Sequence, residues 1–96
     1  MLFAWDEAKN RSNVFKHGIS FDQAILVFDG PVWTRLDARF DYGEVRKVSV
    51  GVAHGQAIAT VVHTDRNGVT RIISARLASR AERIQYAKEI RSANDF

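Results

Sequence analysis

The chain has 96 residues, 46% of them hydrophobic and 26% charged, which is the composition of an ordinary globular protein and excludes a disordered or collagen-like chain. Its length leaves room for one hydrophobic core, so we expect a single domain over residues 1–96. The absence of cysteine excludes a disulfide framework and a thiolate zinc site. We find no signal peptide and no apolar stretch of about 18 residues, and we therefore expect a cytoplasmic protein. A core this small leaves stability marginal, which favours a permanent partner.

The net charge of +3 is unevenly distributed along the chain. Residues 1–64 carry seven basic and seven acidic side chains, whereas residues 66–91 carry seven basic and two acidic ones, a local charge of +5. Six of these seven cations are arginine, whose planar guanidinium suits bidentate binding of phosphate. The pattern favours a polyanionic partner, with a solvated charged surface as the alternative.

The first half of the sequence predicts two helices after a short apolar run, 2–5, that is a candidate edge strand. Asp6 is a good N-cap for the first helix, and Gly18 is expected to end it after a basic last turn. Ser20 is expected to cap the second helix, which Asp29-Gly30-Pro31 terminates. The apolar side chains carried by these helices are Ala8, Val14 and Phe15 in the first and Phe21, Ala24, Val27 and Phe28 in the second.

The second half changes to the alternating period of β-strands. Residues 45–53 alternate valine with small or polar residues, as in a strand buried on one face only. Strands 57–64 and 69–76 follow, with turns at 54–56 and 65–68, and residues 33–39 are a candidate earlier strand.

A last helix is predicted after the strands. Ser79 and Glu82 have the spacing of a capping box, and Ile84, Ala87 and Ile90 form a narrow apolar stripe behind them. The fold class expected is therefore α+β, with two N-terminal helices and a C-terminal helix flanking an antiparallel sheet in the order βααββββα.

The residue pattern gives no support to several kinds of chemistry. His17, His54 and His63 lie far apart in the sequence and in different elements, so we expect no metal site. The six glycines are scattered singly, which leaves no glycine-rich phosphate loop, and there is no G-x-S-x-G motif. No cofactor is expected.

The arginines of the last strand and helix are the candidate phosphate site. Alternation along strand 69–76 predicts that Arg71 shares a face with Ile73 and that Arg76 shares the other with Ile72 and Ser74. Arg80 and Arg83 follow in the first turn of the last helix, where unpaired backbone N–H groups also attract anions.

Cleavage of RNA also requires proton transfer, for which the sequence offers few groups. His63 is a candidate by its residue type, and Tyr86 is another if neighbouring arginines lower its pKa. Glu44 is a weaker third candidate. Each also has a structural alternative. His63 is then a histidine whose hydrogen bonds go to the backbone, Tyr86 a packed tyrosine of the last helix, and Glu44 a carboxylate in a turn. We interpret His17 as a structural group at a helix C-terminus.

Two sets of residues give the chain a resemblance to the BrnT family of toxins over residues 2 to about 90. The first set is Phe3-Ala4-Trp5-Asp6-Glu7-Ala8-Lys9, Asn13, Lys16-His17-Gly18-Ile19-Ser20-Phe21, Ala24, Val27-Phe28-Asp29 and Pro31. The second is Gly43-Glu44, Arg46, Gly51, Val62-His63-Thr64, Arg71-Ile72-Ile73-Ser74-Ala75-Arg76, Ala78, Glu82 and Tyr86.

This resemblance implies a type II toxin–antitoxin toxin with a RelE-like fold that cleaves RNA without a metal and inhibits translation. It implies neutralisation by a BrnA-type antitoxin, in a hetero-oligomer for which 2:2 is one stoichiometry, and contact with operator DNA only through that antitoxin. With the charge pattern it assigns candidate catalytic roles to His63, Arg76, Tyr86 and Arg80, and candidate RNA-binding roles to Arg71, Arg83, Lys47 and Arg46.

Two positions depart from the family pattern, which often has Asp at Gly30 and a basic residue at Leu77. The loss of a cation at Leu77 leaves open an alternative function, an inactive nucleic-acid- or antitoxin-binding module that acts as a co-repressor. An antitoxin is expected to cover the arginines with acidic or aromatic residues. Trp5, Trp33 and Phe40 are candidate anchors for it, with burial in the core as the alternative for each.

Overall fold

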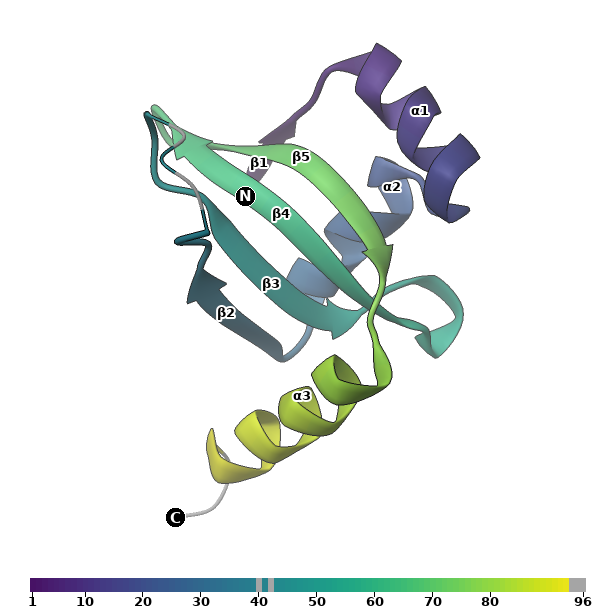
Figure 1. Cartoon of the computed structure of the whole chain (residues 1–96), viewed down its shortest axis with the longest axis vertical. Helices are drawn as coiled ribbons and strands as arrows, with labels where there is room; N and C mark the ends of the chain where they lie inside the picture. Colours follow the sequence, from purple (N-terminus) through teal and green to yellow (C-terminus); the bar gives the residue numbers. More distant parts are fainter. Residues whose placement is uncertain (40, 42, 94–96) are drawn as a thin grey trace.

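A computed structural model, which describes residues 1–39, 41 and 43–93, has one five-stranded sheet and three α-helices. The elements in chain order are β1 (Leu2–Ala4), α1 (Glu7–His17), α2 (Phe21–Ala24), a 3₁₀ helix (Ile25–Asp29), β2 (Val32–Leu36), β3 (Lys47–Val52), a 3₁₀ turn (His54–Gln56), β4 (Ile58–Arg66), β5 (Val69–Leu77) and α3 (Arg80–Ala93) (Figure 1). The α+β class is confirmed.

The sheet is mixed, which corrects the expectation of an antiparallel one. Its strands lie in the order β1-β5-β4-β3-β2, and β1 pairs with β5 in parallel, while the other pairs are antiparallel. The first strand is brought beside the last one by tertiary contacts that no local pattern reveals. The second helix also differs from the prediction. It is α-helical for only four residues, Phe21–Ala24, and then continues as the 3₁₀ helix Ile25–Asp29.

The helix ends agree with their sequence signals. The Asp6 carboxylate accepts hydrogen bonds from the N–H groups of Ala8 and Lys9, and Gly18 ends α1 with a φ of 72°. Ser20 and Gln23 form a reciprocal capping box at α2. Ser79 and Glu82 form the predicted one at α3. These signals are local, and the structure confirms them.

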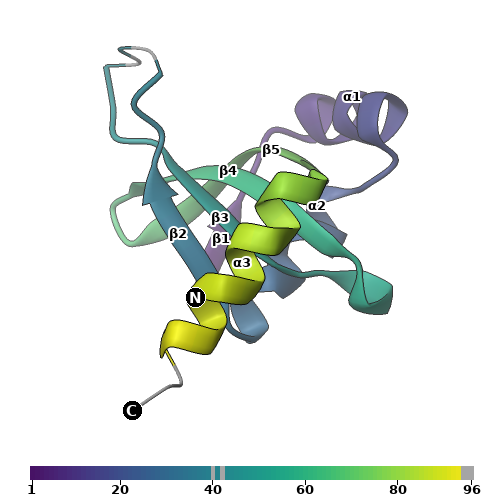
Figure 2. The same ribbon diagram turned by 60° about the horizontal axis from the view of Figure 1, so that its bottom comes forward.

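The two faces of the sheet are covered differently. The helix α2 and the first 3₁₀ helix cover one face, where Phe21, Val27, Val61 and Ile72 form the main core, while α1 lies beside β5 (Figure 1). The helix α3 lies across the other face, on the opposite side from α2, and covers only part of it (Figure 2). Because both faces of β3 are covered, Val50, Ser49 and Gly51 are all buried, and the prediction of a strand buried on one face is wrong.

The contact faces of α1 and α3 differ from the predicted apolar stripes. Val14 and Phe15 are exposed, and the buried residues of α1 are Asn10 and Asn13. In α3 the residue that packs on the sheet is Tyr86, with Ile90 beside it, while Ile84 is 48% exposed. In the described part of the chain, no helix is both long and apolar enough to cross a membrane.

Candidate functional site

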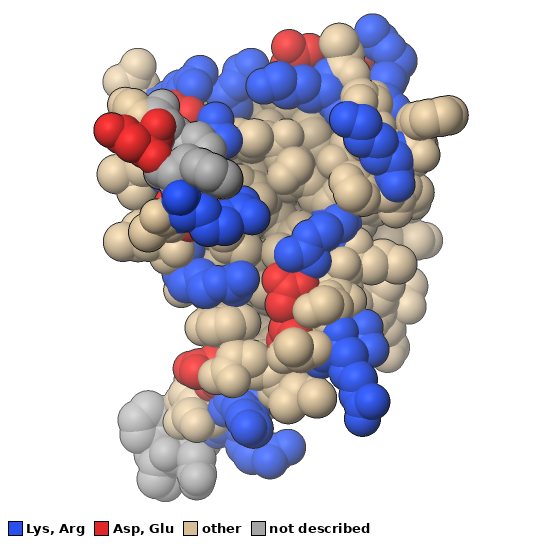
Figure 3. Space-filling view, in the orientation of Figure 1, with Lys and Arg blue, Asp and Glu red and all other residues tan. Residues whose placement is uncertain are grey.

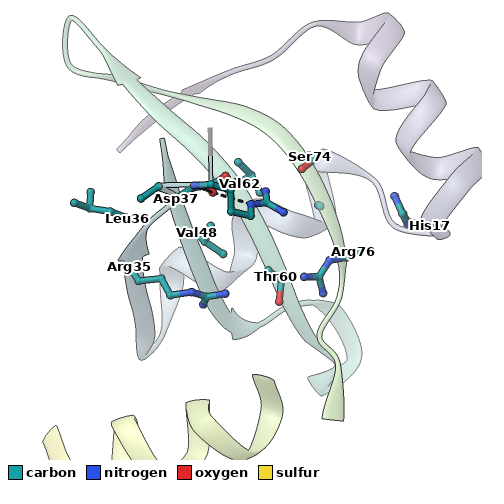
Figure 4. A pocket seen from close by; sticks show the side chains of 12 residues that line it. His17, Arg35, Leu36, Asp37, Val48, Thr60, Val62, Ser74 and Arg76 are labelled. Carbon is teal, nitrogen blue, oxygen red and sulfur yellow. Dashed lines mark hydrogen bonds and ion pairs between the residues drawn. The ribbon is translucent and has the colours of Figure 1, made fainter. Parts of the chain in front are cut away.

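The part of the sheet that α3 leaves open contains a hollow of about 380 Å³. Its floor is formed by side chains of the three central strands: Val48, Thr60, Val62 and Ser74. Arginines from three segments of the chain surround this floor, Arg35 from β2, Arg39 from the segment after it and Arg76 from β5 (Figure 4). Figure 3 shows basic side chains around an uncharged centre on this face of the molecule. The arrangement suits an anionic ligand.

A β-bulge in β5 determines which of its side chains face the hollow. Val62 pairs with Ser74, but His63 pairs with Ile72, so Ile73 is an extra residue without a partner in β4. The extra residue reverses the alternation, as bulges do, and Arg71 therefore lies on the same face as Arg76. The prediction that these two arginines face opposite sides is wrong, as is the placement of Ile72 beside Arg76.

Arg76 is held in place by the first turn of α3. Its guanidinium donates two hydrogen bonds to the Glu82 carboxylate, at 2.6 and 3.0 Å, and Arg35 lies 3.6 Å from the same carboxylate. The Arg76 guanidinium, with help from the backbone N–H and hydroxyl of Ser79, lowers the pKa of Glu82 from 4.5 to about 2. The carboxylate thus remains charged at neutral pH and occupies one side of Arg76, as a phosphate would.

Other polar groups border the hollow. Asp37, which is buried, pairs with Arg39 through two hydrogen bonds of 2.8 and 3.0 Å. The Thr60 hydroxyl is buried and has no hydrogen-bond partner among the described residues. His17, at the C-terminal end of α1, lines the edge of the hollow. Arg35, Arg39 and His17 are not among the predicted site residues, because nothing in the local sequence shows that the ends of β2 and α1 border the same hollow.

His63 lies on the opposite face of the sheet. It is 4% exposed, its Nε2 is 2.7 Å from the Ser49 hydroxyl, and its ring packs edge-on against Phe28 at 5.0 Å. Burial lowers the pKa of His63 below 6.5, while nearby Asp65 raises it and Lys47 lowers it to lesser extents. The structure therefore does not bring His63 together with the arginines of the hollow.

The burial of His63 predicts a pH-dependent stability. Since its pKa is lower in the folded chain than in the unfolded one, the free energy of unfolding should be unaffected above about pH 7 and should fall as the pH drops below 6.5. We expect a loss of stability between pH 7 and 5, measured by urea unfolding. His63→Asn should remove this dependence and His54→Asn, in an exposed turn, should keep it. If the free energy of unfolding depends equally on pH in both variants, His63 is not the group responsible.

Tyr86 is also part of the core rather than of the hollow. It is buried under α3, and its hydroxyl donates a 2.8 Å hydrogen bond to the Pro31 carbonyl. Burial raises the pKa of Tyr86 above 10.0, which is opposite to the lowering expected from neighbouring arginines. His63 and Tyr86 lie on different faces of the sheet, so the structure does not bring them together as an acid–base pair.

The remaining predicted cations are dispersed. Arg80 is exposed at the start of α3, and Arg83 donates a hydrogen bond to the Ala78 carbonyl. Lys47 pairs with Asp65 at 3.0 Å, on the His63 side of the sheet. Arg46 lies 3.6 Å from Glu44. These residues do not line the hollow.

Glu44 and the aromatic anchors have structural partners. The Glu44 carboxylate accepts hydrogen bonds from Arg66, which, with Arg46 nearby, lowers its pKa below 4.5. Trp5 packs against Phe21, and Trp33 packs beside Val50 and Tyr86, so both are half-buried in the core. Phe40 lies outside the described residues.

In the described part of the chain, we find no group of three or more histidine, cysteine or carboxylate side chains placed to hold a metal ion.

Two comparisons with known proteins agree with each other. Residues 5–82 match the sequence model of a family described as "Ribonuclease toxin, BrnT, of type II toxin-antitoxin system". The crystal structure of the Brucella abortus ribonuclease toxin BrnT, at 1.1 Å resolution, is similar in fold, with a TM-score of 0.62 and 24% sequence identity over 83% of this chain and 100% of that chain. A comparison with curated protein sequences gave no significant match.

Proposed function

Because the chain belongs to the family of BrnT ribonuclease toxins of type II toxin–antitoxin systems, we propose that it binds and cleaves RNA in the hollow beside α3. The observation that carries this proposal is the convergence of Arg35, Arg39 and Arg76, from three segments of the chain, on one cavity. Guanidinium groups hold phosphates in bidentate fashion and stabilise the charge that develops on them during cleavage.

We propose that cleavage proceeds without a metal: the ribose 2′-oxygen loses its proton and attacks the neighbouring phosphate, the P–O5′ bond breaks, and the leaving 5′-oxygen takes up a proton. That reaction needs a group that moves a proton and a group that stabilises the added negative charge. Arg76 and Arg35 are placed for the second role, with the Glu82 carboxylate as the anion that phosphate displaces. His17 is the histidine that lines the hollow, and we assign proton transfer to it rather than to His63 or Tyr86.

The basic residues around the hollow have binding roles in this proposal. Arg71 lies on the same face of the sheet as Arg76, and we propose that it binds a flanking phosphate. Arg80 and Arg83, at the start of α3, are placed for weaker contacts with the RNA. Lys47 and Arg46 have carboxylate partners away from the hollow, so we assign them no role in binding.

We further propose that the protein acts in the cytoplasm, inhibits translation by cutting RNA, and is neutralised by a BrnA-type antitoxin. An antitoxin with acidic side chains over the hollow would pair with the same arginines and exclude RNA. Contact with operator DNA would then come through the antitoxin alone.

The alternative function, an inactive co-repressor, depends on the missing cation at Leu77, and the position of Leu77 does not support it. Leu77 follows Arg76 in β5 and lines a separate small pocket with Ile19 and Ala53, on the other face of the sheet. A leucine at this position therefore removes no charge from the hollow. RNA cleavage remains the function that the arrangement of the arginines supports.

The proposal is tested by incubating the purified chain with single-stranded RNA in excess EDTA. We expect cleavage to continue in EDTA and to leave 2′,3′-cyclic phosphate ends, because the attacking oxygen belongs to the RNA. His17→Asn should slow it by about 100-fold, while His54→Asn, in an exposed turn, should leave it unchanged. Cleavage that depends on added divalent metal would overturn the metal-free mechanism, and equal rates for the two variants would remove His17 from it.

A further inference from the structure

A second groove adjoins the hollow, between α1 and β5. It has a volume of about 190 Å³ and is lined by Lys9, Ser12, Asn13, Lys16, His17, Ile73 and Ser74. His17 and Ser74 line both the groove and the hollow, so the two lie side by side. Anything that fills the hollow and extends past these two residues enters the groove.

The groove has a basic wall formed by one face of α1. Lys9, Ser12 and Lys16 are spaced three and four residues apart, which places them on the same side of the helix. All three are exposed. The two lysines are separated by about 10 Å along the helix axis, because each residue advances it by about 1.5 Å. No ion pair of either lysine occurs among the described residues.

The bulge in β5 shapes the opposite wall. Ile73, the extra residue of the bulge, lines the groove, and the adjacent Ser74 lies at the junction with the hollow. The bulge that places Arg71 on the same face of the sheet as Arg76 thus also supplies a wall of the adjacent groove. Basic side chains lie over α1 on the same face of the molecule as the hollow (Figure 3).

We propose that this groove holds the RNA strand next to the cleaved phosphate, with Lys9 and Lys16 binding two of its backbone phosphates. This inference rests on the proposed function, because the position of the groove directly beside the arginine-lined hollow is what favours RNA over an acidic protein segment as the occupant. The contacts are to the backbone and give affinity without base specificity. The binding surface therefore extends to α1, although residues 1–64 have no net charge.

Binding assays with ligands of two lengths test the groove. The probes are a fluorescein-labelled 2′-O-methyl decauridylate, which lacks the attacking hydroxyl and stays intact, and the corresponding dinucleotide, which is short enough to occupy the hollow alone. We expect Lys9→Ala/Lys16→Ala to raise the Kd of the decamer about tenfold and to lower the slope of log K against log salt by about 1.4, since each phosphate contact on a single strand contributes about 0.7. The Kd of the dinucleotide should change less than twofold.

Arg11→Ala/Lys88→Ala is the matched control. It removes the same charge from exposed positions on α1 and α3 that do not line the groove, so its decamer affinity should stay within about threefold of the unmodified chain. Equal decamer affinities for the two double variants would overturn the proposal. If the groove variant behaves as expected but unmodified RNA is never cut, the groove stands and the proposed cleavage fails. If RNA is cut but the two double variants bind the decamer equally, the groove proposal fails and the cleavage proposal stands.

Discussion

Arg76→Ala should lower the rate of RNA cleavage by about 100- to 1,000-fold, the loss typical when a donor to a developing oxyanion is removed. The reason is geometric. Arg76 projects into the hollow from β5, a central strand of the sheet, and two hydrogen bonds to Glu82 hold its guanidinium there until phosphate displaces the carboxylate. The rate is measured on a short labelled RNA, and growth arrest after induction in cells gives a second readout.

Two further variants separate the role of Arg76 from its effect on the fold. Arg76→Lys keeps the charge but cannot bind phosphate through two parallel hydrogen bonds, so we expect only partial activity. Arg91→Ala removes an exposed arginine from the last turn of α3, away from the hollow, and should leave the rate within twofold. If Arg76→Ala stays folded by circular dichroism and cleaves RNA at the unmodified rate, the hollow is not the active site.

The features that could be predicted from sequence are those with local signals. The capping residues Asp6, Ser20 and Ser79 and the terminating Gly18 each act on backbone groups within a few residues, so their positions in the sequence suffice. The same holds for the turn between β4 and β5, where Asn67 and Gly68 adopt positive φ values of 52° and 81°.

The candidate site was less predictable because its geometry depends on contacts between distant segments. The local charge of +5 points to β5 and to Arg76, which borders the hollow, but the facing of Arg71 depends on a bulge that ordinary alternation does not reveal. Arg35 comes near Arg76 only through the Glu82 carboxylate that both approach, and His17 only through the packing of α1 against β5. His63 matched the required chemistry by residue type, and burial on the other face is what separates it from the hollow.

The buried face of α1 illustrates the same limit and leads to the largest stability effect we expect. A search for apolar residues at helical spacing selects Val14 and Phe15, yet the residue that fixes α1 to the sheet is Asn13. Its amide N–H groups donate to the carbonyls of Ile19 and Ala75, at 2.9 and 2.8 Å, and its oxygen accepts from the Ala75 N–H at 3.1 Å. Because β1 pairs with β5 only as far as Arg71, the Asn13 side chain takes the place of a neighbouring strand at Ala75.

Asn13→Ala should therefore lower the free energy of unfolding by about 3 kcal/mol, since it leaves three backbone groups without partners at a position that is 6% exposed. For a domain of this size such a loss corresponds to a fall in Tm of roughly 10–20 °C. Asn13→Asp should cost more, because a carboxylate cannot donate to the two carbonyls and is repelled by them. Ser12→Ala, at the neighbouring exposed position, should change stability by less than about 0.5 kcal/mol.

Hydrogen exchange distinguishes this bridging role of Asn13 from a general loss of packing. In Asn13→Ala the Ala75 amide should exchange faster than the global unfolding rate of the variant allows, because the Asn13 oxygen that accepts its hydrogen bond is gone. The neighbouring amides of β5 that bond to β4 should instead follow global unfolding. If the variant keeps its Tm within a few degrees and the Ala75 amide stays protected, the backbone of β5 at Ala75 does not depend on Asn13 for its hydrogen bonds.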